Sequence, residues 1–422
     1  MFRSMGFAMA FAAAAAPAYA QTTDEYQQLQ QRVERLEAQT KARGQSAFNP
    51  DISLILQGTA ATIKQDPETY QITGFAPSGG EIGPPRRGFS LSESEFVLSG
   101  NIDPYFAGKL VAALTPEDEI EVEEAFFTTL ALGRGLTLKG GRFLSGIGYQ
   151  NEIHQHAWDF QDTALAYKAF LGGRLNDDGV QLRWVAPTDF LLELGTEVGR
   201  GRTFPATDPN KNGAGAWSLF GRVGGDFAGS AWRAGLSYLR VSPREREFAD
   251  EDSLAGETTQ SFTGRSQLWI ADFVAKWANF KLQAEYFRRR ESGDLAYDDS
   301  DGSAVFGPLS DRYKSTQSGW YAQAVYRFLP QWRAGYRYDR LDHGSVANGI
   351  VDNGLGPTAA DFPLLMTDHN PTRNTVMVDW SPTEFSRLRL QFASDKSRSN
   401  VTDNQLVLQY ILSLGAHGAH TF

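Results

Sequence analysis

Hydrophobicity alternates with a period of two residues from about residue 50 onward, and this alternation constrains the fold more than any other feature. It is plainest in residues 217–224, 280–289, 320–328 and 332–339. Because successive side chains of a β-strand point to opposite faces, each run predicts a strand with one apolar and one polar face. A soluble β-sandwich would show the same alternation, so the period alone does not identify the environment of the strands.

The connections between these runs alternate between short turns and a second set of mostly long loops. Seven short turns fall at 101–104, 132–135, 187–189, 228–230, 278–279, 330–331 and 381–383. The other connections are 65–88, 146–177, 201–215, 242–265, 292–316 and 342–372, with two short ones at 116–119 and 397–403. This pattern is typical of bacterial outer-membrane barrels, with turns in the periplasm and loops outside.

These connections join sixteen strands, and a closed bacterial barrel needs an even number. We predict strands at 50–64, 89–100, 105–115, 120–131, 136–145, 178–186, 190–200, 216–227, 231–241, 266–277, 280–291, 318–328, 332–341, 373–380, 384–396 and 404–414. Their lengths of roughly 9–15 residues are close to what crosses the hydrocarbon layer at a tilt. The predicted fold is therefore all-β, a 16-stranded antiparallel transmembrane β-barrel over residues 48–422.

Aromatic residues support this prediction, because many of them flank the short turns. They are Tyr105, Phe106, Trp184, Phe190, Phe227, Trp232, Trp277, Phe280, Phe328, Trp332, Trp380 and Phe385. Rings at one end of nearly every hairpin are typical of the aromatic girdle at a membrane interface. A soluble sandwich has no reason to concentrate them beside one set of turns.

Composition excludes several other classes of protein. A mean hydropathy of −0.37 and a charged fraction of 21% do not fit a polytopic helical membrane protein. A net charge of −10 gives no basic footprint for nucleic acid. The absence of cysteine excludes disulfides, thiolate metal sites and cysteine nucleophiles.

The first 43 residues predict two segments that precede the barrel. Residues 1–20 have a positive start at Arg3, an apolar stretch and a small-residue cleavage site, as in a secretory signal peptide; an uncleaved anchor is the alternative. Residues 21–43 carry an a/d seam of Tyr26, Leu29, Val33 and Leu36, which predicts a periplasmic coiled-coil helix, or else a frayed linker. If the remainder is a porin, this helix favours a homotrimer.

The layout of signal peptide, coiled coil and sixteen strands resembles Gram-negative outer-membrane porins of the phosphate-selective O and P type. Residues 138–148, a strand that ends in Gly141, Arg142 and Phe143 before a long loop, are similar to the fifth-strand region of that group. The stretches FNPDISLILQG and GFSLSESEFVLSGNIDPYF are similar to proteins labelled zinc-regulated TonB-dependent outer-membrane receptors. Such receptors place a large plug domain before a barrel of about 22 strands, which this chain has no room for.

The resemblance to outer-membrane barrels implies their partners: outer-membrane lipid and, through the C-terminal Phe422, the barrel assembly machinery. If the apolar phase of each strand faces lipid, the basic side chains of the other phase face the lumen, because Arg or Lys at bilayer depth costs about 2–4 kcal/mol. These basic positions are Lys139, Arg183, Arg222, Arg233, Lys276, Lys281, Arg327, Arg333, Arg337, Arg387 and Arg389. Acidic inward positions are Glu93, Glu95, Glu121, Glu123, Glu193 and Glu197.

A transverse field across a pore constriction needs acidic groups opposite an arginine ladder. We assign the ladder to Arg327, Arg333, Arg337, Arg387 and Arg389. The longest loop, 146–177, supplies Glu152, Asp159 and Asp162, and in sixteen-stranded porins the third long-side loop typically folds into the barrel. The alternative is that all of these are ordinary solvated lumen charges.

Metal and catalytic chemistry have weaker signals. His154 and His156 on an extended segment would place both imidazoles on one side, with Glu152 in phase, and such a group can contact zinc or copper. No further ligands of known proximity complete the set. The chain has neither a Gly-x-Ser-x-Gly elbow nor a His-Glu-x-x-His pair, so we expect neither an enzyme nor a bound cofactor.

The sequence therefore predicts a porin-like channel of a Gram-negative outer membrane, through which small hydrophilic solutes or ions diffuse passively. The alternative is a substrate-specific receptor or transporter, for zinc or another metal, whose barrel is filled by its loops. A structural or adhesive barrel is a third class.

Overall fold

The structure is a computed structural model, which describes residues 50–76, 78, 82–116, 118–207, 212–227, 229–250, 258–298 and 306–415. The predicted signal peptide (1–20) and coiled-coil helix (21–43), and Phe422 with its expected role in assembly, lie outside the described residues.

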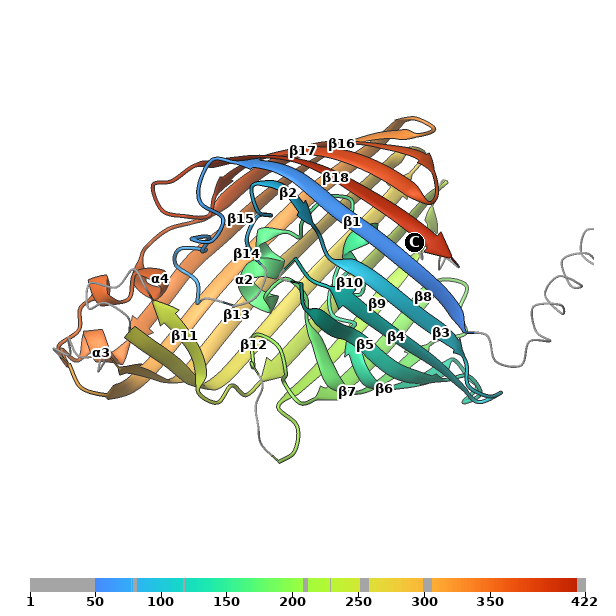
Figure 1. The fold of residues 1–422 in the computed structure, drawn as a ribbon. Helices are drawn as coiled ribbons and strands as arrows, with labels where there is room; N and C mark the ends of the chain where they lie inside the picture. Colours follow the sequence, from blue (N-terminus) through green and yellow to red (C-terminus); the bar gives the residue numbers. More distant parts are fainter. Residues whose placement is uncertain are drawn as a thin grey trace, which may run out of the picture. The chain divides into compact units, whose positions relative to one another are not determined.

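One closed antiparallel sheet forms the wall of a barrel (Figure 1). Its sixteen wall strands are β1 (Asp51–Ile63), β3 (Ser94–Asn101), β4 (Phe106–Leu114), β5 (Ile120–Thr129), β6 (Leu136–Leu144), β7 (Asn176–Val185), β8 (Leu191–Gly199), β9 (Ala216–Phe227), β10 (Ser230–Val241), β12 (Thr258–Trp277), β13 (Phe280–Asp298), β14 (Leu309–Leu329), β15 (Trp332–Asn348), β16 (Thr372–Thr383), β17 (Ser386–Lys396) and β18 (Asp403–Gly415). The predicted 16-stranded barrel is confirmed.

Two further strands are extensions of this wall. β2 (Gly88–Leu91) pairs with residues 58–61 of β1, and β3 pairs with residues 51–55 of the same strand. β2 and β3 together therefore make one interrupted wall strand. β11 (Arg246–Asp250) pairs with the first residues of β12 in the loop beyond β10. The barrel closes where β1 pairs with β18, in a register that runs from Ser53 opposite Gly415 to Ile63 opposite Gln405.

Exposure is inverted relative to a soluble protein. In β17 and β18, Leu390 and Leu408 lie opposite each other and are 50% and 46% exposed, whereas Arg389 and Gln409, one residue away, are fully buried. The aromatic residues beside the short turns lie on the exposed face, among them Phe227 and Trp277. An apolar outer face around a polar interior is the arrangement that a lipid bilayer stabilises.

Strands β12 to β15 are longer than predicted, at 20, 19, 21 and 17 residues. The predicted strand 280–291 ends where the outward phase has turned polar, at Arg288 and Arg290. The pairing nevertheless continues, since a sheet outside the bilayer needs no apolar outer face. We call this extended side the long-loop end of the barrel and the opposite side the short-turn end.

The helices are short and belong to the long connections. They are η1 (Gln155–Ala157), α2 (Leu165–Leu171), α3 (Gly349–Asp352), η2 (Ala359–Asp361) and α4 (Pro363–Met366). Among the residues that the structure describes, no helix combines the length and the apolar character needed to cross a membrane. At the long-loop end, α3 and α4 contribute Ile350 and Leu365 to an apolar cluster with Phe262, Leu295 and Tyr313 from the extended strands.

The exposed face makes a testable prediction. Leu408→Arg, near the middle of β18, should lower the free energy of unfolding in lipid vesicles by about 2–4 kcal/mol, because the guanidinium would face hydrocarbon. The same change at the exposed loop residue Leu355 is the matched control and should cost little. Equal losses from both variants, measured by denaturant titration, would show that the face of β18 is not in contact with lipid.

Candidate functional site

Residues 145–175, which connect β6 to β7, fold into the barrel; we call them the inserted loop, and they replace the predicted bounds 146–177 because β7 begins at Asn176. All seven residues of α2 are buried, although the helix is not part of the barrel wall. Phe170 stacks on Phe287 of β13 at a centroid distance of 6.0 Å, and Tyr167 meets the same ring edge-on at 5.0 Å. Figure 1 shows α2 among the strands, in agreement with these contacts. The inserted loop therefore occupies the lumen.

The inner wall beside α2 is apolar, which the alternation did not predict. Ile270, Phe287, Tyr321 and Leu341 are buried there, on the phase that was expected to be polar, and they form one cluster with α2. Ile72 and Phe75 of the preceding long loop join the same cluster. A loop inside a barrel must bury its own apolar side chains, so the wall supplies an apolar socket at that height.

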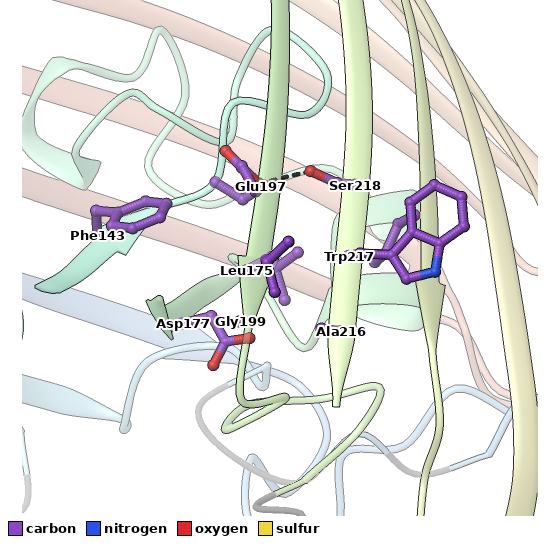
Figure 2. A pocket seen from close by; sticks show the side chains of 11 residues that line it. Phe143, Leu175, Asp177, Glu197, Gly199, Ala216, Trp217 and Ser218 are labelled. Carbon is purple, nitrogen blue, oxygen red and sulfur yellow. Dashed lines mark hydrogen bonds between the residues drawn. The ribbon is translucent and has the colours of Figure 1, made fainter. Parts of the chain in front are cut away.

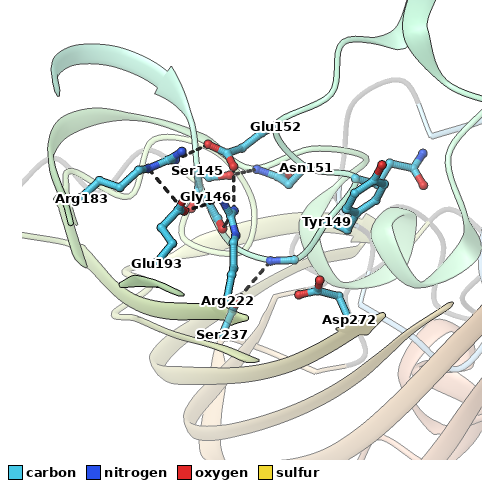
Figure 3. Close-up of polar contacts among 12 residues, drawn as sticks. Ser145, Gly146, Tyr149, Asn151, Glu152, Arg183, Glu193, Arg222, Ser237 and Asp272 are labelled. Carbon is cyan, nitrogen blue, oxygen red and sulfur yellow. Dashed lines mark hydrogen bonds and ion pairs between the residues drawn. The ribbon is translucent and has the colours of Figure 1, made fainter. Parts of the chain in front are cut away.

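Glu152 attaches the inserted loop to strands β7 and β9 (Figure 3). Its carboxylate accepts from Arg183 and, at 2.7 Å, from Nη2 of Arg222. Arg222 also donates to Oε1 of Glu193 at 2.7 Å. Burial alone would raise the pKa of Glu152, but the positive charges of Arg222, Arg183 and Lys139 lower it to about 2.

Asp159 lies against another part of the wall, at strands β13 and β15. Its Oδ2 accepts from Nζ of Lys281 at 2.7 Å, and its Oδ1 accepts from Nη1 of Arg333 at 3.1 Å. Burial alone would raise the pKa of Asp159, yet these cations hold it well below its ordinary value.

Asp162 has the densest set of partners. It pairs with Lys168 of α2 and with Arg337 of β15, each at 3.0 Å, and with Arg373 of β16. Arg337 and Arg373 are almost fully buried, so the carboxylate neutralises cations that water does not reach. These contacts join the inserted loop to the wall and to its own helix.

The five arginines predicted as a ladder do not act as one uninterrupted positive row. Asp379 of β16 lies between Arg333 and Arg389 in the strand register and pairs with them at 2.6 and 3.7 Å. Arg337 pairs with Asp339 as well as with Asp162. Arg387 lies 4.0 Å from Asp379, and Arg327 lines a cavity with Arg333.

That cavity, of about 720 Å³, lies on the short-turn side of the inserted loop and reaches the turn at Ala278 and Asn279. Its wall gathers basic side chains from β12 to β17, namely Lys276, Lys281, Arg327, Arg333 and Arg387. Glu95, Glu152, Asp159, His154 and His156 line it as well. Charges of both signs thus meet in one space at the short-turn end.

His154 and His156 lie together, with rings stacked at 5.9 Å, whereas the carboxylate of Glu152 pairs with Arg183 and Arg222. The expectation of an extended segment with all three in phase is wrong, because η1 turns the chain after His154. The histidines instead meet wall carboxylates: His154 contacts Glu95, Glu123 and Glu124. His156 contacts Glu95 through Nδ1 at 2.9 Å. We call these five residues the acid–histidine cluster.

A β-bulge explains why Glu124 was missed. Glu124 pairs with Val111 and Val122 pairs with Ala112, which leaves Glu123 as the extra residue of β5. Both Glu123 and Glu124 are therefore buried, although strict alternation would send one of them outward. No signal in the sequence marks this bulge.

A second carboxylate secures the start of the inserted loop. Glu197 of β8 accepts from Gly146 N and from Gln181 and Ser218 side chains at 2.6–2.7 Å. Figure 2 shows the bond from Ser218 to Glu197, beside a cavity of about 20 Å³, with Trp217 turned to the other side of its strand. The cavity has room for about one water molecule.

Comparisons place this architecture among known proteins. No protein-family model matches the chain. An uncharacterized protein of Aquifex aeolicus (strain VF5) is 32% identical in an alignment that covers 92% of this chain and 83% of that protein.

Solved structures resemble the fold at low sequence identity. The trimer form of OmpT, an outer membrane protein of Vibrio cholerae, has a TM-score of 0.51 at 11% identity and covers 87% of this chain and 99% of its own. An anion-selective porin from Comamonas acidovorans has a TM-score of 0.51 at 9% identity, with the same coverage. The outer membrane channel DcaP of Acinetobacter baumannii has a TM-score of 0.50 at 12% identity, over 87% and 97%. The likeness is one of fold, that of porin barrels.

Removing the charge of Asp162 should loosen the inserted loop. Asp162→Asn leaves Arg337, Arg373 and Lys168 without their shared counterion, which should cost about 3–5 kcal/mol of unfolding free energy. Denaturant titration measures the loss. The matched control is Asp226→Asn, at an exposed position of β9, which should change the stability little. Equal stability of both variants would contradict an anchoring role.

The Glu152 ion pairs predict a defined pH dependence. Because the folded pKa is about 2 and the ordinary value is 4.5, the stabilisation by Glu152 is complete above pH 4.5 and is lost as the pH falls through 2. Wild type should therefore exceed Glu152→Gln by up to about 3 kcal/mol at pH 7, and the gap should close between pH 4.5 and 2. A gap that stayed constant over this range would count against the assignment.

Proposed function

We propose that this chain, which belongs to the same family as the uncharacterized Aquifex aeolicus protein, is a narrow porin-like channel of a Gram-negative outer membrane. The observation that carries the proposal is a transmembrane barrel whose inserted loop faces charged walls through Glu152, Asp159 and Asp162. A loop held at this depth leaves room for small hydrophilic solutes or ions and excludes large ones.

The short-turn end supports a preference for anions. Lys276, Lys281, Arg327, Arg333 and Arg387 converge on its cavity from neighbouring strands. Two of these, Lys281 and Arg333, share one carboxylate of the inserted loop, Asp159. The basic side chains of this wall therefore outnumber the loop carboxylates that pair with them. A wall of one dominant sign raises the local concentration of the opposite ion.

We also propose a homotrimer in the outer membrane, with the short turns and the N-terminal coiled coil in the periplasm. The heptad seam in residues 21–43 supports this arrangement, as does the trimer form of the similar Vibrio cholerae OmpT barrel. The narrower resemblance to phosphate-selective porins belongs to the same proposal, since phosphate is one anion that such a basic cavity would admit.

The apolar cluster around α2 favours a second candidate function. A lumen packed with Phe170, Phe287 and Tyr321 is what a substrate-specific receptor or transporter would use, with loops that open only for its solute. The two candidates differ in open conductance: the channel conducts small ions continuously, and the receptor does not.

Planar-bilayer recordings test both. The purified full chain should give small stepwise conductance, and a salt gradient should give a reversal potential of the sign expected for anion preference. Replacing Lys276 and Arg327 together by glutamine should shift that potential toward cations, because two positive charges leave the cavity.

The matched control is Arg290→Gln, which removes an arginine from the exposed face of β13 and should leave the potential as in wild type. A clean, folded preparation that never conducts would reject the channel and favour the receptor. An unchanged potential in the double variant would reject the basic cavity as the selectivity element.

A further inference from the structure

We infer that the acid–histidine cluster is a binding site for one divalent transition-metal ion of the Zn²⁺ class, with His154, Glu95 and Glu123 as its protein ligands. This inference stands apart from the channel function. It rests on the positions of three ligand atoms, one from the inserted loop and two from the barrel wall.

The three atoms have the spacing of a metal site. Nδ1 of His154 lies 3.2 Å from Oε2 of Glu95 and 3.4 Å from Oε2 of Glu123, and all three atoms lie within 4.8 Å of one another. Zinc binds histidine nitrogen and carboxylate oxygen at about 2.0–2.1 Å in a tetrahedron, whose edges are then about 3.3 Å. The two separations from Nδ1 of His154 match such an edge.

The same three atoms face only one another. Within the part of the chain that the structure describes, Nδ1 of His154, Oε2 of Glu95 and Oε2 of Glu123 are buried and have no hydrogen-bond partner outside this group of three. Glu95 is fully buried and Glu123 is 6% exposed. Buried polar atoms almost always have a partner, so three such atoms aimed at one another point to an ion that binds between them.

Each ligand is also held by an outer partner through its other polar atom. Nε2 of His154 contacts Oε2 of Glu124 at 2.9 Å. Oε1 of Glu95 contacts Nδ1 of His156 at 2.9 Å, and Oε1 of Glu123 pairs with Arg174. A carboxylate behind a ligating imidazole is the usual second-shell arrangement, because it fixes the tautomer and the ring orientation.

The charge around the cluster suits a dication. Four carboxylates gather here, from Glu93, Glu95, Glu123 and Glu124, against two cations, Lys109 and Arg174. A ligating imidazole is neutral, so the two ligating carboxylates, Glu95 and Glu123, would supply the two negative charges that a single divalent ion neutralises. Glu95 and His154 both line the 720 Å³ cavity, so the fourth coordination position is left to water or a solute from that space.

Such an ion would fasten the inserted loop to the wall. His154 comes from the loop, Glu95 from β3 and Glu123 from β5, so one metal would join three segments that are distant in the sequence. The site does not form from the loop alone or from the wall alone. The β-bulge of β5 and the insertion of the loop bring His154, Glu95 and Glu123 together.

Zinc titration of the metal-stripped full chain, folded in detergent and followed by calorimetry, tests the site. Wild type should bind one Zn²⁺ per chain, and the ion should raise the thermal midpoint. Glu123→Gln, which keeps the side-chain volume, should weaken binding at least a hundredfold. Glu124→Gln, behind the imidazole, should weaken it 10–100-fold.

His369→Gln is the matched control, since His369 is half-buried, is not part of the acid–histidine cluster and uses its Nε2 to contact the carbonyl of Lys396, and it should bind as wild type does. His417 and His420 are unchanged in every variant, so any zinc that binds to them contributes equally to every titration. The strand signal in circular dichroism reports whether each variant folds, and His154→Gln serves if Glu123→Gln does not.

A folded wild type that binds no zinc would overturn the inference, and the cluster would then be a network of protonated histidines and glutamates. Zinc binding that is equal in wild type and Glu123→Gln would overturn it too. Either result would leave the bilayer recordings, and hence the channel proposal, unaffected.

Discussion

Closure of the wall between β1 and β18 is the constraint on which the rest of the structure depends. A sheet in hydrocarbon cannot leave an edge unpaired, because each lone backbone N–H or C=O would cost several kcal/mol. The eleven paired positions from Ser53 to Ile63 remove both edges at once. Once closed, the wall divides the alternating residues into a lipid-facing set and an enclosed set, and every other feature follows from what the enclosed set must satisfy.

The enclosed set is mostly polar and charged, and buried charge needs compensation. Along the later strands this comes partly from the wall, where Asp379 separates Arg333 from Arg389. The remainder comes from the inserted loop, whose carboxylates Asp159 and Asp162 each meet cations of two or more elements. The loop is thus held by charge as well as by the apolar contacts of α2, and its position narrows the lumen.

The interior is divided between two kinds of packing, at two heights. Toward the long-loop end, α2 and Phe75 fill an apolar socket on β10 to β15. Toward the short-turn end lies a charged cavity that Lys276 and Arg327 share with His154. Solute selection by charge belongs to the second region, since a dry apolar cluster offers ions nothing to replace their hydration. The acid–histidine cluster borders the same cavity through Glu95, His154 and His156, and carboxylates outnumber Lys and Arg side chains around it.

The sequence by itself determined the barrel, the number of its strands and which phase of each strand faces outward, because a period of two and the spacing of turns are local properties. It also identified Glu152, Asp159, Asp162 and the two histidines as residues to examine. Only the tertiary structure decided their partners. Nothing in the sequence distinguishes Asp379, Arg373 and Lys168 from other charged residues. No local sequence pattern predicts the bulge that turns Glu124 inward. Pairing across a closed barrel joins positions hundreds of residues apart, such as Gln57 and Gln409, which are 352 residues apart, and no periodicity can encode which side chains will meet there.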